Sequence, residues 1–95
     1  QSAISAMLVE WRPEARAELW QILNYIGDRH LVAASELHQA IEAATSALPQ
    51  HPYLYRFGRV PGTREIVVHP NYLVVYRVTD RIEIVAVLHA RQEYP

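Results

Sequence analysis

The sequence predicts an α+β domain of two layers, in which a helical hairpin packs on one face of a small antiparallel sheet, in the order β-α-α-β-β-β. Apolar residues recur at helical spacing in two stretches of the first half, and three runs rich in Val, Ile and Tyr crowd the second half. The connections between these runs are too short for a crossover helix, so neighbouring strands must pair antiparallel. We expect a single domain over residues 7–95.

The chain begins with six residues that lack both the basic start and the long apolar core of a secretory signal. We expect residues 1–6 to be a poorly ordered extension or an artificial remnant. Leu8–Trp11 then reads as a short strand that ends at Arg12. Pro13 suits the first turn of a helix, where its missing N–H leaves no hydrogen bond unmade.

Two helices are predicted, the first from about residue 13 to Gly27 and the second from about Val32 to Leu48. Each carries one apolar stripe at steps of three and four residues. The stripes consist of Ala15, Leu19, Ile22 and Ile26, and of Ala34, Leu37, Ile41, Ala44 and Leu48. The segment between the helices is short enough to require an antiparallel hairpin.

Residues 49–62 hold three prolines and two glycines, which exclude a long regular element. The segment also holds three aromatic rings, those of Tyr53, Tyr55 and Phe57. We expect a packed connector that these rings fasten to the core. The alternative is a loop whose rings contact a partner together with Arg56 and Arg59.

Three strands follow, at about Thr63–His69, Tyr72–Thr79 and Arg81–His89. Because side chains alternate along a strand, each strand can be divided into two faces. The set expected under the helices is Tyr72, Val74, Tyr76 and Val78, with Ile82, Ile84, Ala86 and Leu88. The opposite set is Leu73, Val75, Val85 and Val87, joined by Ile66 and Val68 and rimmed by Arg64, Arg77, His89 and Arg91.

The chain has no helix left to cover this second face of the sheet. Its aliphatic side chains would form a patch of several hundred Å², a size that marks interaction sites. We expect a protein partner to cover the patch. The alternative is that residues 49–62 fold across it. The basic rim suits acidic side chains of a partner and equally suits a phosphodiester.

Composition narrows the class of protein further. Nine arginines against ten acidic residues leave a net charge of −1, which gives no support to a free nucleic-acid binder. No stretch approaches the length of a membrane span. The chain has no cysteine, and its five histidines show no HExxH or HxH spacing, so we expect no metal site and no cofactor. The absence of cysteine suits the cytoplasm.

Three stretches together carry a family resemblance: VEWRPEARAELWQILNYI, ALPQHPYLYRFGRVPGTREIVVHPNYLVVYRV and IEIVAVLHARQEYP. Their ordered set resembles the RelE/ParE superfamily of toxins from bacterial type II toxin–antitoxin modules. The resemblance implies a cytoplasmic growth inhibitor, linked to plasmid stabilisation and held inactive by a cognate antitoxin. It also implies that the toxin meets operator DNA only through its antitoxin. We expect the antitoxin on the second sheet face, at Ile66, Val68, Leu73, Val75, Arg77, Val85 and Val87.

The superfamily has two modes of action, and the resemblance leaves both open. RelE-like members cleave mRNA in the ribosome, whereas ParE-like members poison DNA gyrase. For the nuclease mode, Arg64 and Arg91 match basic catalytic positions, His89 could act as base or acid, and Tyr94 could act as acid or stack on a base.

The sequence also departs from the nuclease pattern. Leu73 stands where RelE-like toxins carry an arginine, and Ile66 where they carry a lysine. These gaps and the net charge favour gyrase poisoning. A variant nuclease site that uses His69, Asn71 and His89 stays open.

Overall fold

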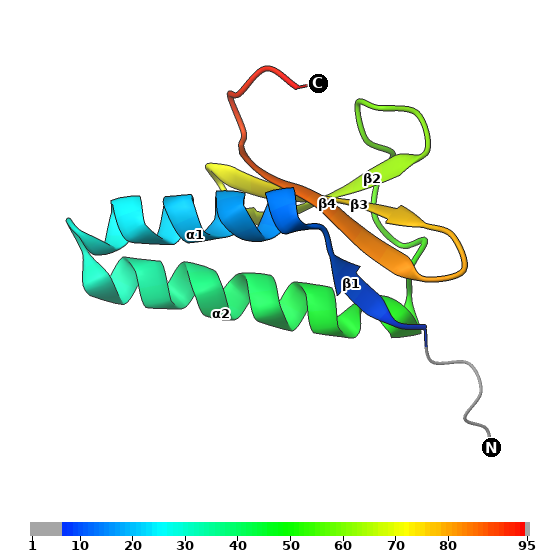
Figure 1. The fold of residues 1–95 in the computed structure, drawn as a ribbon, viewed down its shortest axis with the longest axis horizontal. Helices are drawn as coiled ribbons and strands as arrows, with labels where there is room; N and C mark the ends of the chain where they lie inside the picture. Colours follow the sequence, from blue (N-terminus) through cyan, green and yellow to red (C-terminus); the bar gives the residue numbers. More distant parts are fainter. Residues whose placement is uncertain (1–6, 95) are drawn as a thin grey trace.

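The computed structural model describes residues 7–94 and contains the predicted elements in the predicted order (Figure 1). Their bounds are β1 Val9–Trp11, α1 Pro13–Gly27, α2 Leu31–Ala47, a short 3₁₀ turn η2 Leu48–Gln50, β2 Thr63–His69, β3 Tyr72–Val78 and β4 Ile82–His89. The α+β prediction is confirmed. The expectation for residues 1–6 lies outside the described residues, as does Pro95.

The four strands form one sheet in the order β1-β4-β3-β2. The three C-terminal strands pair antiparallel as predicted, but β1 pairs parallel with β4, with Val9 opposite Ile82 and Trp11 opposite Ile84. The sheet is therefore mixed, and the expectation of an all-antiparallel sheet was wrong. The chain between β1 and β4 includes both helices, and a connection of that length allows parallel neighbours.

The helical hairpin lies on one face of the sheet and runs on past its edge (Figure 1). Pro13 occupies the start of α1 as predicted. Helix α2 is capped by His30, whose Nδ1 accepts a hydrogen bond from the N–H of Ala33 at 3.1 Å. Only residues 28–30 separate the helices, so they pack antiparallel.

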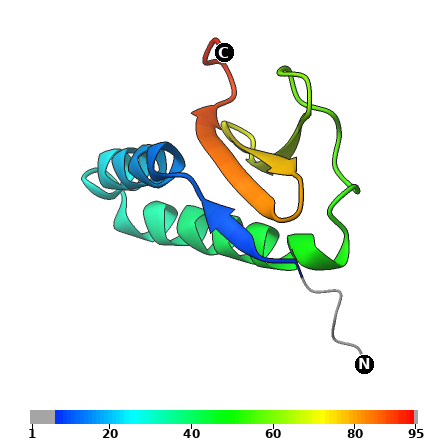
Figure 2. The same cartoon turned by 45° about the vertical axis from the view of Figure 1, so that its right-hand side comes forward.

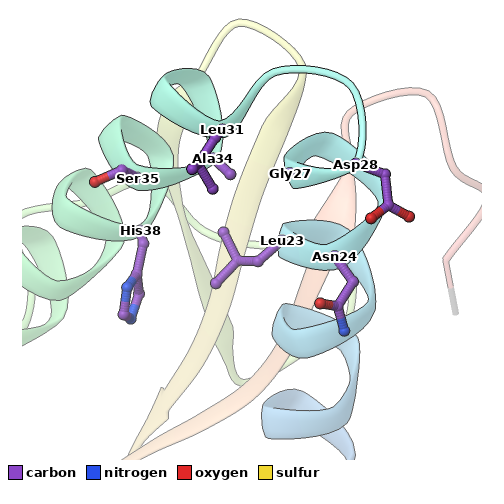
Figure 3. A pocket seen from close by; sticks show the side chains of 8 residues that line it. All are labelled: Leu23, Asn24, Gly27, Asp28, Leu31, Ala34, Ser35 and His38. Carbon is purple, nitrogen blue, oxygen red and sulfur yellow. The ribbon is translucent and has the colours of Figure 1, made fainter.

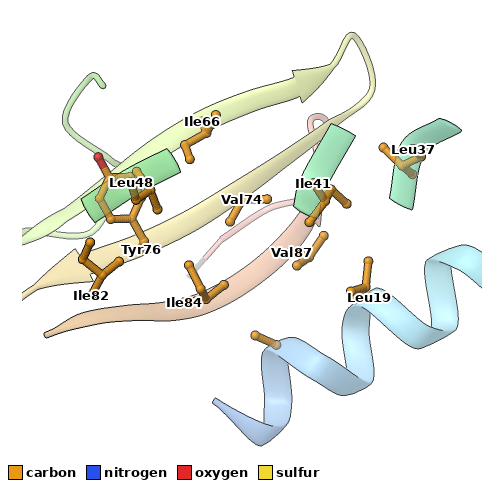
Figure 4. Close-up of a cluster of buried hydrophobic side chains, with 11 residues drawn as sticks. Leu19, Leu37, Ile41, Leu48, Ile66, Val74, Tyr76, Ile82, Ile84 and Val87 are labelled. Carbon is orange, nitrogen blue, oxygen red and sulfur yellow. The ribbon is translucent and has the colours of Figure 1, made fainter. Parts of the chain in front are cut away.

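The main core fills the space between the hairpin and the sheet (Figure 4). Its buried members are Ala15, Leu19, Leu37, Ile41, Leu48, Ile66, Val74, Tyr76, Ile82, Ile84 and Val87. The predicted helix stripes supply the helical part of this cluster. Each large aliphatic side chain in it contributes about 1.5–3 kcal/mol through removal of apolar surface from water.

The division of β4 into two faces was wrong from Ala86 onward, because the pairing with β3 shifts by one residue at Val85. Val75 lies opposite Ala86 while Tyr76 lies opposite Ile84, so Val85 is a bulge residue. The bulge turns Val87 toward the main core and turns Ala86 and Leu88 to the second face. The N–H of Val87 donates to Oε1 of Glu18 on α1 at 2.9 Å.

The assignment of β2 was wrong as well. Ile66 lies opposite Val74 and belongs to the main core, and Val68 packs against the same core. The residues of β2 on the second face are therefore Glu65 and Val67, which lie opposite Val75 and Leu73.

The second sheet face is covered by the chain itself. Leu73, Val75, Ala86 and Leu88 form a smaller buried cluster, against which Val85, Ala90 and Tyr94 pack. The C-terminal segment after β4 is tied to the connector by Arg59, whose Nη1 donates to the carbonyl of Gln92 at 2.9 Å and whose Nη2 donates to that of Ala90 at 3.3 Å. The expectation of an open aliphatic face was therefore wrong.

A buried carboxylate holds this cover in place. Glu65 is 3% exposed, and its Oε1 accepts from Nη2 of Arg56 at 3.1 Å. Its Oε2 accepts from the backbone N–H of Arg59 at 3.1 Å, with Nε of the same arginine 3.7 Å away. The single acid therefore fixes both arginines of the connector next to the second face.

Candidate functional site

The residues predicted to bind an antitoxin differ in how far solvent reaches them. Ile66, Leu73, Val75 and Val87 are buried, Ile66 and Val87 beneath the helices and the other two in the second-face cluster. Val68, Arg77 and Val85 are half-buried. Arg77 is engaged with Glu83, whose Oε1 lies 3.6 Å from its Nη1. The predicted surface is thus reduced to three separate partly exposed side chains.

Arg64 of β2 points into the connector. Its Nη1 donates to the carbonyls of Tyr53 and Tyr55 at 3.1 and 2.7 Å. The guanidinium carbon lies 4.3 Å from the ring centroid of Phe57 and 5.3 Å from that of Tyr53. Hydrogen bonds to carbonyls and cation–π contacts thus hold this arginine at a structural position.

Among the other predicted catalytic residues, His89 lies at the opposite end of the sheet. His89 ends β4 next to Tyr72, with ring centroids 5.3 Å apart, and its Nδ1 accepts from the N–H of Arg91 at 3.1 Å. The Arg91 side chain is exposed, and Tyr94 packs on the second-face cluster.

The distance between Arg64 and His89 along the sheet follows from the strand pairing. Arg64 lies opposite Tyr76 of β3, whereas His89 lies opposite Tyr72. Those two β3 residues are four positions apart, which is about 13 Å along a strand. The structure therefore does not bring Arg64 together with His89.

Three rings gather where β2, β3 and β4 meet at this end. The ring of Tyr72 lies between those of His69 and His89, at centroid distances of 5.7 and 5.3 Å. Nδ1 of His69 accepts from the N–H of Asn71 at 3.0 Å, which repeats the arrangement at His89. A neutral imidazole that accepts at Nδ1 carries its proton on Nε2. Both imidazoles therefore present an Nε2–H to their surroundings.

The connector is held to the sheet by a second group, the phenol of Tyr76. Its hydroxyl donates to the carbonyl of Pro52 at 2.6 Å, and its ring meets that of Tyr55 edge to face. Burial raises the pKa of Tyr76 above its ordinary value of 10.0, an effect that the nearby Arg64 guanidinium only partly offsets. Of the three connector aromatics, Tyr55 alone packs inward as predicted.

The hairpin carries a furrow that the sequence did not lead us to expect (Figure 3). One hollow of about 410 Å³ is lined by Leu23, Asn24, Gly27, Asp28, Leu31, Ala34, Ser35 and His38. A neighbouring hollow of about 320 Å³ is lined by Arg16, Leu19, Trp20, Leu23 and His38. Because Leu23 and His38 line both, the two hollows form one furrow along α1 and α2.

Large apolar side chains border this furrow in the open. Trp20 is 67% exposed and Leu31 is 76% exposed. Trp20 follows Leu19 directly and Leu23 lies three residues further on, so a wider apolar stripe on the first helix was the available signal in the sequence.

In the described part of the chain, no helix is long and apolar enough to cross a membrane.

Residues 9–94 match the protein family described as the ParE toxin of the type II toxin–antitoxin system, parDE. A Sinorhizobium fredii protein that bears a toxin name, Y4kP, is 33% identical over 93 residues, which cover 97% of each chain. Toxin RelE2 of Caulobacter vibrioides is 34% identical over 83 residues, which cover 86% of this chain and 93% of that protein.

Solved structures share the fold. The chromosomal ParDE system of Pseudomonas aeruginosa contains a chain that superposes with a TM-score of 0.77 at 21% identity, over 90% of this chain and 97% of that one. The toxin–antitoxin complex RelBE2 of Mycobacterium tuberculosis contains a chain with a TM-score of 0.61 at 17% identity, over 97% of this chain and 100% of that one. These two likenesses concern the fold alone.

Proposed function

Because this chain belongs to the family of ParE toxins of type II toxin–antitoxin systems, we propose that it inhibits growth by poisoning DNA gyrase, without cleaving nucleic acid itself. The observation that carries the proposal is the dispersal of the residues a nuclease would need. Arg64 donates hydrogen bonds to connector carbonyls. Along the strands it is separated from His89 by about 13 Å.

Metal-free cleavage of RNA needs a base at the 2′-hydroxyl, cations beside the developing phosphorane charge and an acid at the leaving oxygen, all within hydrogen-bond reach of one phosphate. The two positions where RelE-like toxins carry further cations are Ile66 and Leu73 in this chain, and both are buried in apolar clusters. A single phosphate cannot contact Arg64 and His89 together in this arrangement. A role without chemistry fits the geometry better.

The toxin acts within a pair, and its partner is a cognate antitoxin. For the antitoxin we propose the furrow between α1 and α2 as the main contact, because it is concave, elongated and bordered by Trp20 and Leu31. An amphipathic helix lays its apolar face into a groove of this kind. Among the seven residues first expected to contact the antitoxin, Val68, Arg77 and Val85 keep partial exposure, but none of them lines the furrow.

A gyrase cleavage assay tests the main proposal. Purified toxin, gyrase, ATP and supercoiled plasmid should yield linear DNA after protein denaturation, in an amount that rises with toxin concentration. Purified antitoxin added first should abolish the linear product. Expression of the same chain in cells must stop growth. If it does, and the purified toxin yields no more linear DNA than a reaction without toxin, gyrase poisoning is refuted.

The ring cluster of His69, Tyr72 and His89 favours one second candidate, a ribosome-dependent mRNA endonuclease. Its two imidazole rings lie next to the ring of one tyrosine, and acid–base cleavage could draw on such side chains. Primer extension on mRNA after toxin induction tests this candidate. Codon-phased cuts that disappear in His89→Ala would establish it, and their absence in the wild type would exclude it.

A further inference from the structure

The connector between α2 and β2 exposes three large apolar side chains within five residues. Tyr53 is 65% exposed, Leu54 is 67% exposed and Phe57 is 76% exposed. Together they present roughly 400 Å² of apolar and aromatic surface, within the range of the largest patches found on single-chain proteins. We call these three residues the connector patch. Figure 2 shows the connector on the outer side of the sheet, away from α1.

The backbone beneath the connector patch is held by bonds on both sides. At the start, Tyr76 binds the carbonyl of Pro52 at 2.6 Å, and Arg64 binds the carbonyls of Tyr53 and Tyr55. Arg64 also lies against the rings of Tyr53 and Phe57, so those two rings flank one guanidinium. The exposed rings therefore have fixed positions.

Around Phe57 the connector forms a short ladder with β2. The N–H of Gly58 donates to the carbonyl of Thr63 at 2.8 Å, and the N–H of Glu65 donates to the carbonyl of Arg56 at 3.1 Å. A Cβ at residue 58 would lie 2.4 Å from Oγ1 of Thr63, so a larger residue there would displace that buried side chain. Gly62 completes the turn with a φ of +85°, a value that favours glycine.

A structure that orders exposed apolar side chains is prepared for binding, because the entropy cost of ordering them has been met before a partner arrives. Tyr and Arg are also among the residues that dominate binding energy at protein interfaces. A hollow of about 140 Å³ lies beside the rings, lined by Tyr53, Phe57, Gly62, Thr63, Arg64 and Val78. The patch can therefore insert its rings into a partner and also receive a partner side chain.

We infer that the connector patch is the surface by which the toxin grips its folded protein target, with Arg64 as the residue that positions it. This inference rests on the proposed function, under which the target is DNA gyrase. The site on the target is an apolar pocket with acidic residues on its rim.

The high exposure of these three side chains favours a folded target over the antitoxin. Three side chains that project from a loop need a pocket, and a single helix or extended segment cannot build one. The furrow between α1 and α2 is concave and suits such a segment. The two surfaces also involve different elements, since the furrow lies on the hairpin and the patch lies next to β2.

The charge of the connector favours a protein with carboxylates. Residues 49–64 hold three arginines and no acid, in a chain with a net charge of −1. Glu65 offsets one of these charges, which leaves a local positive excess. The arginine donors themselves are engaged, at Arg64 by carbonyls and at Arg56 by Glu65, so they attract acidic groups at a distance rather than clamp a phosphate.

The test uses the double variant Leu54→Ser/Phe57→Ser and the single variant Leu54→Ser. The Leu54 side chain takes part in none of the described hydrogen bonds of the connector, so its replacement should leave the connector in place. The matched control is Leu8→Ser, which removes an equally exposed leucine from another part of the chain. Each chain is expressed with and without its antitoxin, and cell survival is measured. Co-purification with the antitoxin reports on folding and on the partner surface.

We expect the double variant to raise the toxin concentration needed for growth arrest about tenfold or more and Leu54→Ser to raise it less. Both should still co-purify with the antitoxin, and Leu8→Ser should behave as wild type. Undiminished toxicity of the double variant would overturn the inference. Full toxicity that the antitoxin no longer neutralises would also overturn it and would assign the patch to the antitoxin.

The failure of this inference differs from the failure of the proposed function. Survival is measured without reference to the target, so a toxic wild type that stabilises no gyrase cleavage refutes gyrase alone. A double variant that is as toxic as wild type and stabilises as much gyrase cleavage refutes the patch alone. A nuclease whose codon-phased cuts persist in the double variant refutes both.

Discussion

The buried carboxylate of Glu65 is the most informative place to perturb the fold. In Glu65→Gln one carboxylate oxygen becomes an NH₂ group, which must face either Nη2 of Arg56 or the N–H of Arg59. One charge-assisted hydrogen bond is lost and two donors oppose each other. The matched control is Glu83→Gln, whose carboxylate bridges two arginines on the surface and whose side chain is 31% exposed against 3% for Glu65.

The expected magnitudes differ clearly. Removal of one partner of a buried hydrogen bond costs about 1–3 kcal/mol when it leaves a donor without an acceptor, and more when the bond involves a charged group, so Glu65→Gln should lower the free energy of unfolding by roughly 2–4 kcal/mol. The Glu83 pairs have long contacts of 4.0 and 3.6 Å, so their loss should cost less than about 1 kcal/mol. For a domain of this size each 1 kcal/mol lowers Tm by about 4–8 °C, so Tm should fall by about 8–30 °C in Glu65→Gln and by less than about 8 °C in Glu83→Gln.

Thermal and urea unfolding, followed by circular dichroism, measure both variants on the purified toxin. Urea midpoints at constant slope separate a change in stability from a change in the unfolded state. Equal loss of stability in Glu65→Gln and Glu83→Gln would refute the view that Glu65 holds the cover of the second sheet face.

Three further predictions concern the connector, the furrow and the second face. Tyr76→Phe should lower stability at pH 8 by about 1–2 kcal/mol through loss of the bond to Pro52. Because burial raises the pKa of Tyr76 above 10.0, its contribution is full below pH 10 and falls as the pH rises above that value. Urea unfolding should therefore show that the free energy of unfolding falls less between pH 8 and pH 10.5 in Tyr76→Phe than in wild type. An equal fall in the two proteins would contradict this. Trp20→Ser should weaken antitoxin binding about tenfold or more by calorimetry, against no change in Leu8→Ser, and unchanged affinity would exclude the furrow. Leu73→Arg, which adds the arginine of RelE-like toxins, should yield unfolded protein rather than a nuclease, because it buries an unpaired charge. Leu73→Met should fold with a loss below about 1.5 kcal/mol, and a folded Leu73→Arg that cuts mRNA would overturn the assignment.

The helices and the order of strands could be predicted from the sequence because their signals are local. Pro13 fits the first turn of a helix because its φ is fixed and its missing N–H would have no partner there, and the apolar stripes of both helices can be read from residue spacing alone. The parallel pairing of β1 with β4 depends on how the whole chain folds, because the two strands are far apart in the sequence. No local sequence pattern predicts it.

The faces of the sheet could be predicted only as far as the alternation holds. The bulge at Val85 inserts one residue and exchanges the sides of Ala86 and Val87, and nothing in a run of valines and alanine marks it. The course of the connector depends on bonds from Tyr76 and Arg64, which lie far along the chain. The sequence could therefore not show that Arg64 donates hydrogen bonds to the carbonyls of Tyr53 and Tyr55.

The most direct test of the central claim is gyrase-dependent cleavage of supercoiled plasmid by wild-type toxin and by His89→Ala, measured side by side with primer extension on cellular mRNA. The account predicts that both proteins linearise the plasmid to the same extent and that neither produces codon-phased cuts. Codon-phased cuts by the wild type that vanish in His89→Ala, with no linear plasmid from either protein, would contradict it.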